Sequence, residues 1–154
     1  MEPLLILICL VTYLLRRLET IIIKELPHDL VFEINRSMGL NLFRTKHDIS
    51  FKKNNEKYMV YKSDGYNKSE SLFLYMNTFY DLKETKSTNL LFNSTPSKSV
   101  LLPEVKSVDY IIKYVGEKKN IKYFVKSLSL MKQISSCYSL NKKKIKSVNN
   151  LIVD

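Results

Sequence analysis

The feature that constrains the fold of this chain most strongly lies in the second half of the stretch from Pro103 to Ile134. Apolar residues recur there at helical spacing. The stripe consists of Ile121, Phe124, Val125, Leu128, Met131 and Ile134. A helix with such a stripe packs one face on a core and turns the other face to solvent. The pattern predicts a helix over 121–137, preceded by another over 104–115, with Gly116 between them.

Lysines accompany this stripe, and acidic residues are missing from the region. No Asp or Glu occurs from Lys118 to Val153, whereas nine lysines do. The candidate anion-binding residues are Lys118, Lys119, Lys122 and Lys126, with Lys113 as a further member. One interpretation is a solvated face that only keeps the chain soluble. The other is a binding site for an anionic partner, because lysine clusters beside an amphipathic surface dock on anionic membranes at roughly 1 kcal/mol per lysine.

The charge of the whole chain supports an anionic partner. The 154 residues fit one domain and carry a net charge of +10. Residues 1–30 hold three basic and four acidic side chains, so the rest of the chain carries +11. Alanine and tryptophan do not occur, and Lys, Asn and Ile are abundant. This composition is typical of an AT-rich genome, such as that of an organelle, a large DNA virus or a parasite, so part of the lysine excess reflects mutational bias.

The strongest apolar segment lies at the start of the chain. It runs from Pro3 to Leu15 and is interrupted by Arg16 and Arg17. About a dozen apolar residues are fewer than the roughly 20 that a bilayer requires. The segment therefore predicts an apolar helix that is buried in the core or lies against a membrane, and a membrane anchor is the open alternative.

Turn and cap signals divide the middle of the chain. Pro27 suits the first turn of a helix that Gly39 would end. Two β-type runs around Asn54-Asn55-Glu56 predict a hairpin over 49–62. The segment Ser71–Leu82 fits a strand or a helix, and a strand at its start is favoured.

The more polar remainder predicts connecting structure. Residues 83–99 are expected to form a loop, and Leu101-Leu102 an apolar plug. The predicted fold class is therefore α+β: a small antiparallel sheet, made of the hairpin and a third strand, packs with N-terminal and C-terminal helices. A single domain would cover residues 1–140, and residues 141–154 would be a basic tail or a short last helix.

The chain offers little for catalysis or metal binding. His28 and His47 are isolated, Cys9 and Cys137 stand alone, and three glycines can hardly form a phosphate-binding loop. The sequence therefore predicts a protein that is not an enzyme, with no cofactor and no metal. Two cysteines form no disulfide framework, which fits a reducing compartment.

Four segments spread along the chain resemble a family of small poxvirus late proteins, of the vaccinia H-seven type. They read VTYLLRRLETIII, ISFKKNNEKYM, SDGYNKSESLFL and IKYFVKS. The resemblance implies a small α+β domain, partly similar to phosphoinositide-binding PX domains, that takes part in forming the crescent membranes of new virions. The matching cationic positions are Lys122 and Lys126, with Lys118 and Lys119 just upstream, whereas Tyr123 and Ser127 stand where the family carries more charge.

These observations lead to two hypotheses from different classes. The first is a late viral factor for virion membrane biogenesis, on the cytosolic face of membranes at viral factories in the host cytoplasm. Its partners would be membranes with anionic phospholipids, phosphoinositides above all, and other viral membrane-assembly proteins. The second is a mitochondrially encoded structural subunit. It would be a ribosomal protein whose lysines bind RNA phosphates, or a membrane-anchored accessory subunit of a respiratory complex.

Overall fold

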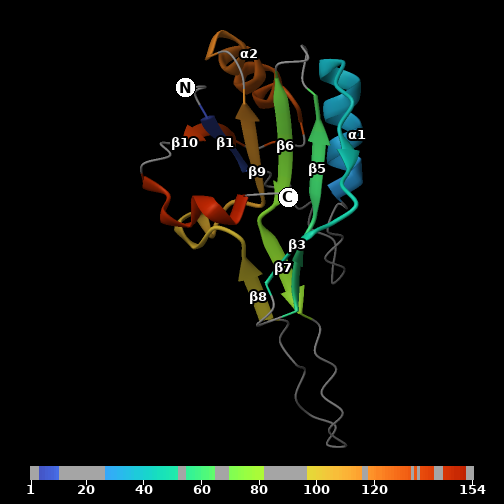
Figure 1. Cartoon of the computed structure of the whole chain (residues 1–154). Coiled ribbons are helices and arrows are strands. Elements are labelled where there is room, and N and C mark those ends of the chain that lie inside the picture. The colour runs from blue at the N-terminus through green and yellow to red at the C-terminus, as the bar shows by residue number, and fades with distance from the viewer. Residues whose placement is uncertain are drawn as a thin grey trace, which may run out of the picture.

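The centre of the protein is a six-stranded sheet with the strand order β10-β1-β9-β6-β5-β2 (Figure 1). The computed structural model describes residues 4–10, 27–51, 55–64, 70–81, 97–115, 118–132, 134, 136–140 and 144–151. The strands are β1 (Leu4–Leu10), β2 (Phe43–Arg44), β5 (Val60–Ser63), β6 (Ser71–Met76), β9 (Tyr110–Val115) and β10 (Ser136–Leu140). Every neighbouring pair is antiparallel. Together with its helices, this sheet confirms the predicted α+β class.

The predicted N-terminal helix is wrong where the structure describes it, because Leu4–Leu10 is the strand β1. This strand lies between β9 and β10, with Ile8 opposite Ile111 on one side and Tyr138 on the other. A continuous apolar run suits a buried helix and an interior strand equally well, so periodicity could not separate them. The rest of the predicted helix lies outside the described residues.

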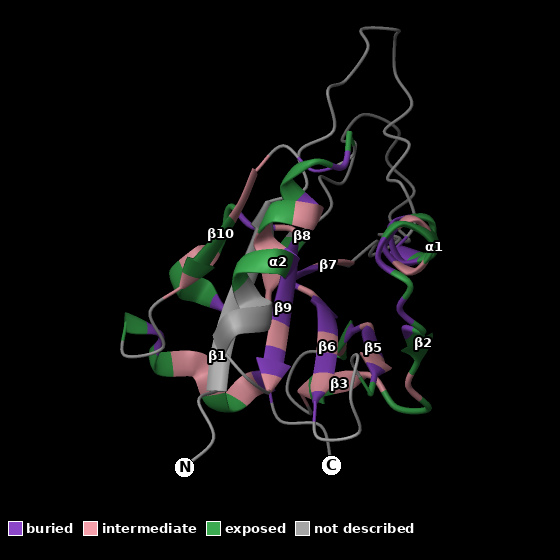
Figure 2. Ribbon diagram, turned by 90° about the horizontal axis from the view of Figure 1, so that it is seen from above, coloured by how far each residue is buried: buried purple, intermediate pink, exposed green. Residues whose placement is uncertain are grey.

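The predicted helix over 104–115 is also wrong. A short 3₁₀ helix, η1 (Pro103–Val105), is followed by the strand β9. β9 contributes buried residues to both faces of the sheet, and Figure 2 shows it as one of the most buried strands. Its sequence YIIKYV is rich in β-branched and aromatic residues, which favour the pleated conformation.

Two helices cover one face of the sheet (Figures 1 and 2). The helix α1 (Pro27–Met38) begins at the predicted proline, and Gly39 follows it with a φ of 63°, a left-handed conformation that glycine adopts without strain. The helix α2 (Lys118–Ser129) ends eight residues earlier than the predicted range 121–137, and β10 begins inside that range.

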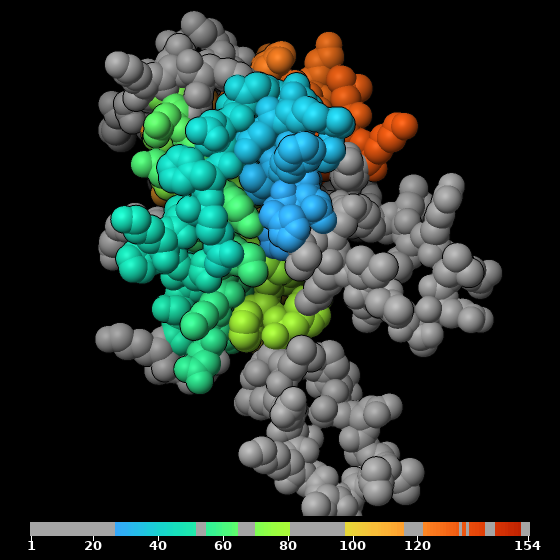
Figure 3. Space-filling model, turned by 90° about the vertical axis from the view of Figure 1, so that its right-hand side faces the viewer, coloured from blue at the N-terminus to red at the C-terminus, as the bar shows by residue number. Residues whose placement is uncertain are grey.

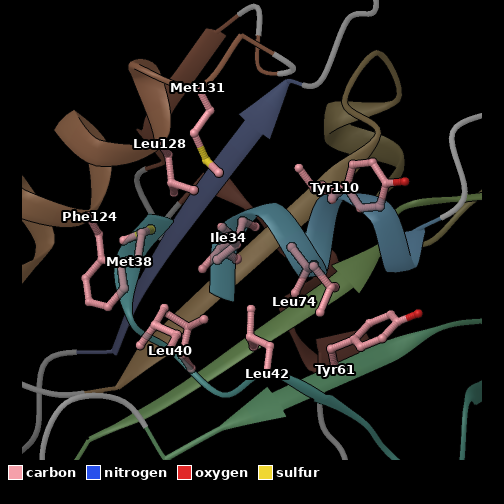
Figure 4. Close-up of a cluster of buried hydrophobic side chains, with 14 of the residues drawn as sticks. Ile34, Met38, Leu40, Leu42, Tyr61, Leu74, Tyr110, Phe124, Leu128 and Met131 are labelled. Atoms are coloured by element: carbon pink, nitrogen blue, oxygen red, sulfur yellow. The ribbon is translucent and has the colours of Figure 1, made fainter. Parts of the chain in front are cut away.

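The helical spacing persisted beyond the end of α2 because a turn keeps the next apolar residues in the same core. Met131 and Ile134 are buried although they lie after the helix. This first core includes residues of both helices, the segment between α1 and β2, and one face of the sheet (Figure 4). The close-up labels Ile34, Met38, Leu40, Leu42, Tyr61, Leu74, Tyr110, Phe124, Leu128 and Met131.

The predicted hairpin is present, with its second strand divided. β3 (Ile49–Phe51) pairs with β4 (Glu56–Tyr58), and the chain then continues into β5 of the large sheet. The favoured strand at Ser71 is confirmed as β6. A second small pair follows, β7 (Thr78–Asp81) with β8 (Ser97–Val100), so the last residues of the predicted loop 83–99 form a strand. Residues 82–96 lie outside the described part of the chain.

A second core lies on the other face of the sheet, and it buries the predicted apolar plug. Its residues are Tyr58, Val60, Tyr75, Leu101, Leu102, Val108, Ile111, Ile145 and Leu151. The side chain of Asn77, which is fully buried between β6 and β7, organises the loop above this core. It accepts a hydrogen bond from the backbone N–H of Leu102 (2.9 Å) and donates to the carbonyls of Val105 (3.0 Å) and Val108 (2.8 Å).

Ile145 and Leu151 belong to this core and lie beyond residue 140, where the predicted domain ends. Residues Lys146–Leu151 form the short 3₁₀ segment η3, which is kinked at Ser147 and corresponds to the alternative of a last helix. The hydroxyl of Tyr75 donates to the carbonyl of Leu151 over 3.0 Å, and burial raises the pKa of Tyr75. The carboxylate of Glu104 accepts hydrogen bonds from the backbone N–H groups of Lys146 and Ser147 and from the Ser147 hydroxyl.

We expect the contact of the Glu104 carboxylate with Lys146 and Ser147 to make the free energy of unfolding depend on pH in the acid range. Hydrogen bonds from Ser147 lower the pKa of Glu104 below its ordinary value. Its stabilisation is therefore complete above the unfolded-state pKa of about 4.3 and is lost as pH falls through the lower folded-state pKa. Glu104→Gln should lower the free energy of unfolding at neutral pH by less than about 1 kcal/mol, since the group is exposed. In urea titrations the difference from the unmodified protein should vanish below this window, and a constant difference would contradict the assignment.

Candidate anion-binding face on helix α2

The helix α2 presents opposite faces to the core and to solvent. Phe124 and Leu128 are buried against the sheet, and the ring of Phe124 lies 5.2 Å from that of Tyr114, centroid to centroid. Lys122 and Lys126 are exposed on the other side. The 3.6-residue period that predicted this helix therefore also placed Lys122 and Lys126 correctly on the exposed face.

The two exposed lysines form a cationic pair one helical turn apart. Among the described residues, neither Lys122 nor Lys126 forms an ion pair with a carboxylate. Lys118 and Lys119 are the first two residues of the same helix, and their side chains lie outside the described part. Positive charge on this face is thus available to an anionic ligand.

Large apolar side chains share this surface, which the sequence reasoning missed. Tyr123 is 56% exposed, and Leu130, directly after the helix, is 77% exposed. Tyr123, Lys126 and Leu130 follow the spacing i, i+3, i+7 and so share one side of the helix. We call Lys122, Tyr123, Lys126 and Leu130 the α2 outer face. The exposed Leu130 could have been found from the sequence, since it lies opposite the apolar stripe.

Lys113 is not brought together with these lysines. It lies on β9, where its ammonium donates to the carbonyl of Leu151 over 3.0 Å and lies 5.3 Å from the centre of the Phe73 ring. Phe73 and Leu151 belong to the second core, on the face of the sheet that α2 does not cover. Because successive residues of a strand point to opposite faces, the side chain of Lys113 faces away from α2.

A cleft of about 460 Å³ adjoins the α2 outer face where α2 passes α1. It is lined by Glu33, Arg36, Ser37, Ser127, Leu130, Met131 and Lys132. Figure 3 shows α1 in blue beside the orange residues at this end of α2. Arg36 contacts Glu33 over 2.8 Å, and Lys132 is exposed. The cleft therefore adds two cations, one of them paired, next to Leu130.

Within the described ranges, other kinds of site find little support. No group of three His, Cys, Asp or Glu residues there could hold a metal ion. His28 is an exposed neighbour of Asp29, at 3.4 Å, at the beginning of α1. Among all the described residues, no helix has the length and apolar character needed to cross a membrane.

Comparisons with protein-family models, with curated proteins and with solved structures find no match for this chain. Within the part of the chain that the structure describes, the α2 outer face combines exposed charge with exposed apolar side chains.

Proposed function

We propose that this protein is a non-enzymatic factor that docks on anionic phospholipid membranes through the α2 outer face. One observation carries the proposal: Lys122 and Lys126 are exposed without ion pairs among the described residues, and they alternate with the exposed Tyr123 and Leu130. A helix that lies in a membrane interface combines lysines with aromatic and leucine residues in this way. A face that served solubility alone would have no need of the apolar pair.

The expected energies suit reversible docking. Each lysine near an anionic leaflet contributes roughly 1 kcal/mol, and burial of one leucine contributes about 1.5–3 kcal/mol. Tyrosine adds an amphipathic ring at the level of the headgroups. Together these contributions exceed thermal energy severalfold, while they stay far below those of a membrane-spanning helix.

The resemblance to the poxvirus late family supports a narrower form of the proposal. It matches IKYFVKS, the segment of α2 that contains Lys122 and Lys126. In this form the ligand is a phosphoinositide, and the protein acts in the formation of virion crescent membranes at viral factories in the host cytoplasm. Other viral membrane-assembly proteins would be its partners there.

The test is sedimentation of the full-length protein with liposomes of phosphatidylcholine alone, with phosphatidylserine, and with a phosphoinositide, at low and physiological salt. We expect Lys122→Glu combined with Lys126→Glu to weaken binding to the anionic liposomes on the order of 100-fold, because attraction is lost and repulsion is added at both positions. A matched control is Lys98→Glu with Lys106→Glu, which changes the net charge equally at two exposed lysines outside α2. The control should bind nearly as well as the unmodified protein.

Two outcomes would redirect the proposal. Unchanged liposome binding by the Lys122/Lys126 variant would remove the α2 outer face as the site. Binding of RNA with a steep salt dependence, together with indifference to every liposome, would favour the ribosomal alternative. Leu130→Ser separates the two, since it should weaken membrane docking and leave contacts between lysine and RNA phosphate unchanged.

A further inference from the structure

The two cysteines of this chain occupy neighbouring strands at the margin of the large sheet. Cys9 lies in β1 and Cys137 in β10, and no other cysteine occurs. The antiparallel register places these two residues directly opposite each other. Two residues that are far apart in the sequence are thus paired in the sheet, which the sequence alone did not indicate.

The spacing of this pair suits a disulfide. Opposite residues of an antiparallel pair have Cα atoms about 4.5–5.5 Å apart, and a disulfide requires about 4.4–6.8 Å. The register therefore predicts a Cα separation of Cys9 and Cys137 within the range of a disulfide.

The register of this pair is supported from both sides of β1. Cys9 is also opposite Tyr110 of β9, and Tyr110 and Cys137 both contact the first core. Directly opposite residues belong to the same face of a sheet, so all three positions lie in one row. Pairing with β9 on one side and β10 on the other fixes the register of β1 at this row, since Tyr110 and Cys137 contact the same core.

We propose that Cys9 and Cys137 are the two halves of a disulfide that fastens the edge strand β10 to β1. The bond closes nearly the whole described chain into one loop. Because β10 follows α2 after a short turn, it also secures the strand that anchors the C-terminal end of α2. This modification does not depend on lipid binding, and it departs from the prediction that the two cysteines stand alone in a reducing compartment.

Thiol–disulfide exchange with a low-molecular-weight disulfide, such as oxidised glutathione, supplies the chemistry. The thiolate of one cysteine attacks the glutathione disulfide, whose S–S bond breaks to release one glutathione and leave a mixed disulfide. The second cysteine then attacks the protein sulfur of that mixed disulfide and releases the second glutathione. The two protein thiols lose two electrons and two protons, and oxidised glutathione takes up both to become two glutathione thiols.

The test uses the reduced full-length protein, oxidised glutathione, an alkylating quench and non-reducing peptide mapping. We expect both thiols to disappear, with no glutathione retained and with Cys9 and Cys137 in one cross-linked peptide pair. The rate at which the mixed disulfide closes to the protein disulfide should not depend on protein concentration. In the chain unfolded in guanidinium, this closure should be at least about tenfold slower. Because the loop is long, the melting temperature should rise by about 10 °C, and reduction should reverse the rise.

Cys9→Ser and Cys137→Ser are matched controls, since each should stop at the mixed disulfide with one glutathione attached. The peptide map of the unmodified protein requires neither variant, so it decides the proposal even if a variant folds poorly. Mixed disulfides or intermolecular dimers as the main products of the unmodified protein would overturn the proposal. A melting temperature that stays equal or falls on oxidation would do the same.

Discussion

Asn77→Asp should lower the free energy of unfolding by about 3–5 kcal/mol, measured by guanidinium denaturation. The substitution keeps the shape of a fully buried side chain but replaces its N–H donors with oxygen. The carbonyls of Val105 and Val108 would then face an acceptor instead of a donor, and a charge would be buried without a partner. A domain of this kind is stable by only about 5–15 kcal/mol in total, so this single amide decides much of its stability.

Asn41→Asp is the matched control, because it makes the same chemical change at an exposed position between α1 and β2. It should change the free energy of unfolding by no more than about 0.5 kcal/mol. If the two variants unfolded at the same denaturant concentration, the loop after β8 would not be held by the Asn77 side chain.

Leu151→Ala should lower the free energy of unfolding by about 3 kcal/mol. Leu151 is 1% exposed in the second core, so the shorter side chain leaves a cavity. The backbone carbonyl of residue 151 is unchanged by the substitution, and its hydrogen bonds from Tyr75 and Lys113 remain available. The experiment therefore isolates packing from hydrogen bonding, again by guanidinium denaturation.

The size of this effect also separates two descriptions of the C-terminal segment. If residues 141–154 were only a basic tail, Leu151→Ala would change stability by less than about 0.5 kcal/mol. Asn149→Ala, at an exposed position of η3, should show that small effect in either case. A loss at Leu151 alone would identify the segment as part of the folded domain.

Elements with local signals were predictable from the sequence. Pro27 and Gly39 mark the ends of α1 because their backbone preferences act within a single turn. The hairpin of β3 and β4 is marked in the same way by the polar turn between two β-type runs. No knowledge of distant contacts was required for either element.

Interior strands were not predictable in the same way. The apolar runs of β1 and β9 fit a buried helix as well as a strand, and strand order alone decides between them. That order depends on pairings between residues about 100 positions apart, such as Ile8 with Ile111. Local periodicity contains no information about such pairings.

In the candidate site, too, residues placed by local spacing were predictable, and those placed by strand pairing were not. Lys122 and Lys126 lie where helical spacing predicted them, on the exposed face of α2. Lys113 was named as a further member of this group, and the strand β9, present where a helix was expected at 104–115, turns it toward Leu151 instead. The opposition of Cys9 and Cys137 likewise required the register of β1 and β10.

The position of β1 in the sheet means that this strand is synthesised well before the strands that pair with it. Its neighbours β9 and β10 begin about 100 and more residues further along the chain. At roughly 5–20 residues per second, translation needs about 5–20 s to make the first of them after β1 is complete. During that interval LLILICL has been synthesised while its sheet neighbours do not yet exist. The nascent chain must therefore shelter its most apolar segment by collapse or with a chaperone until the sheet can close around it.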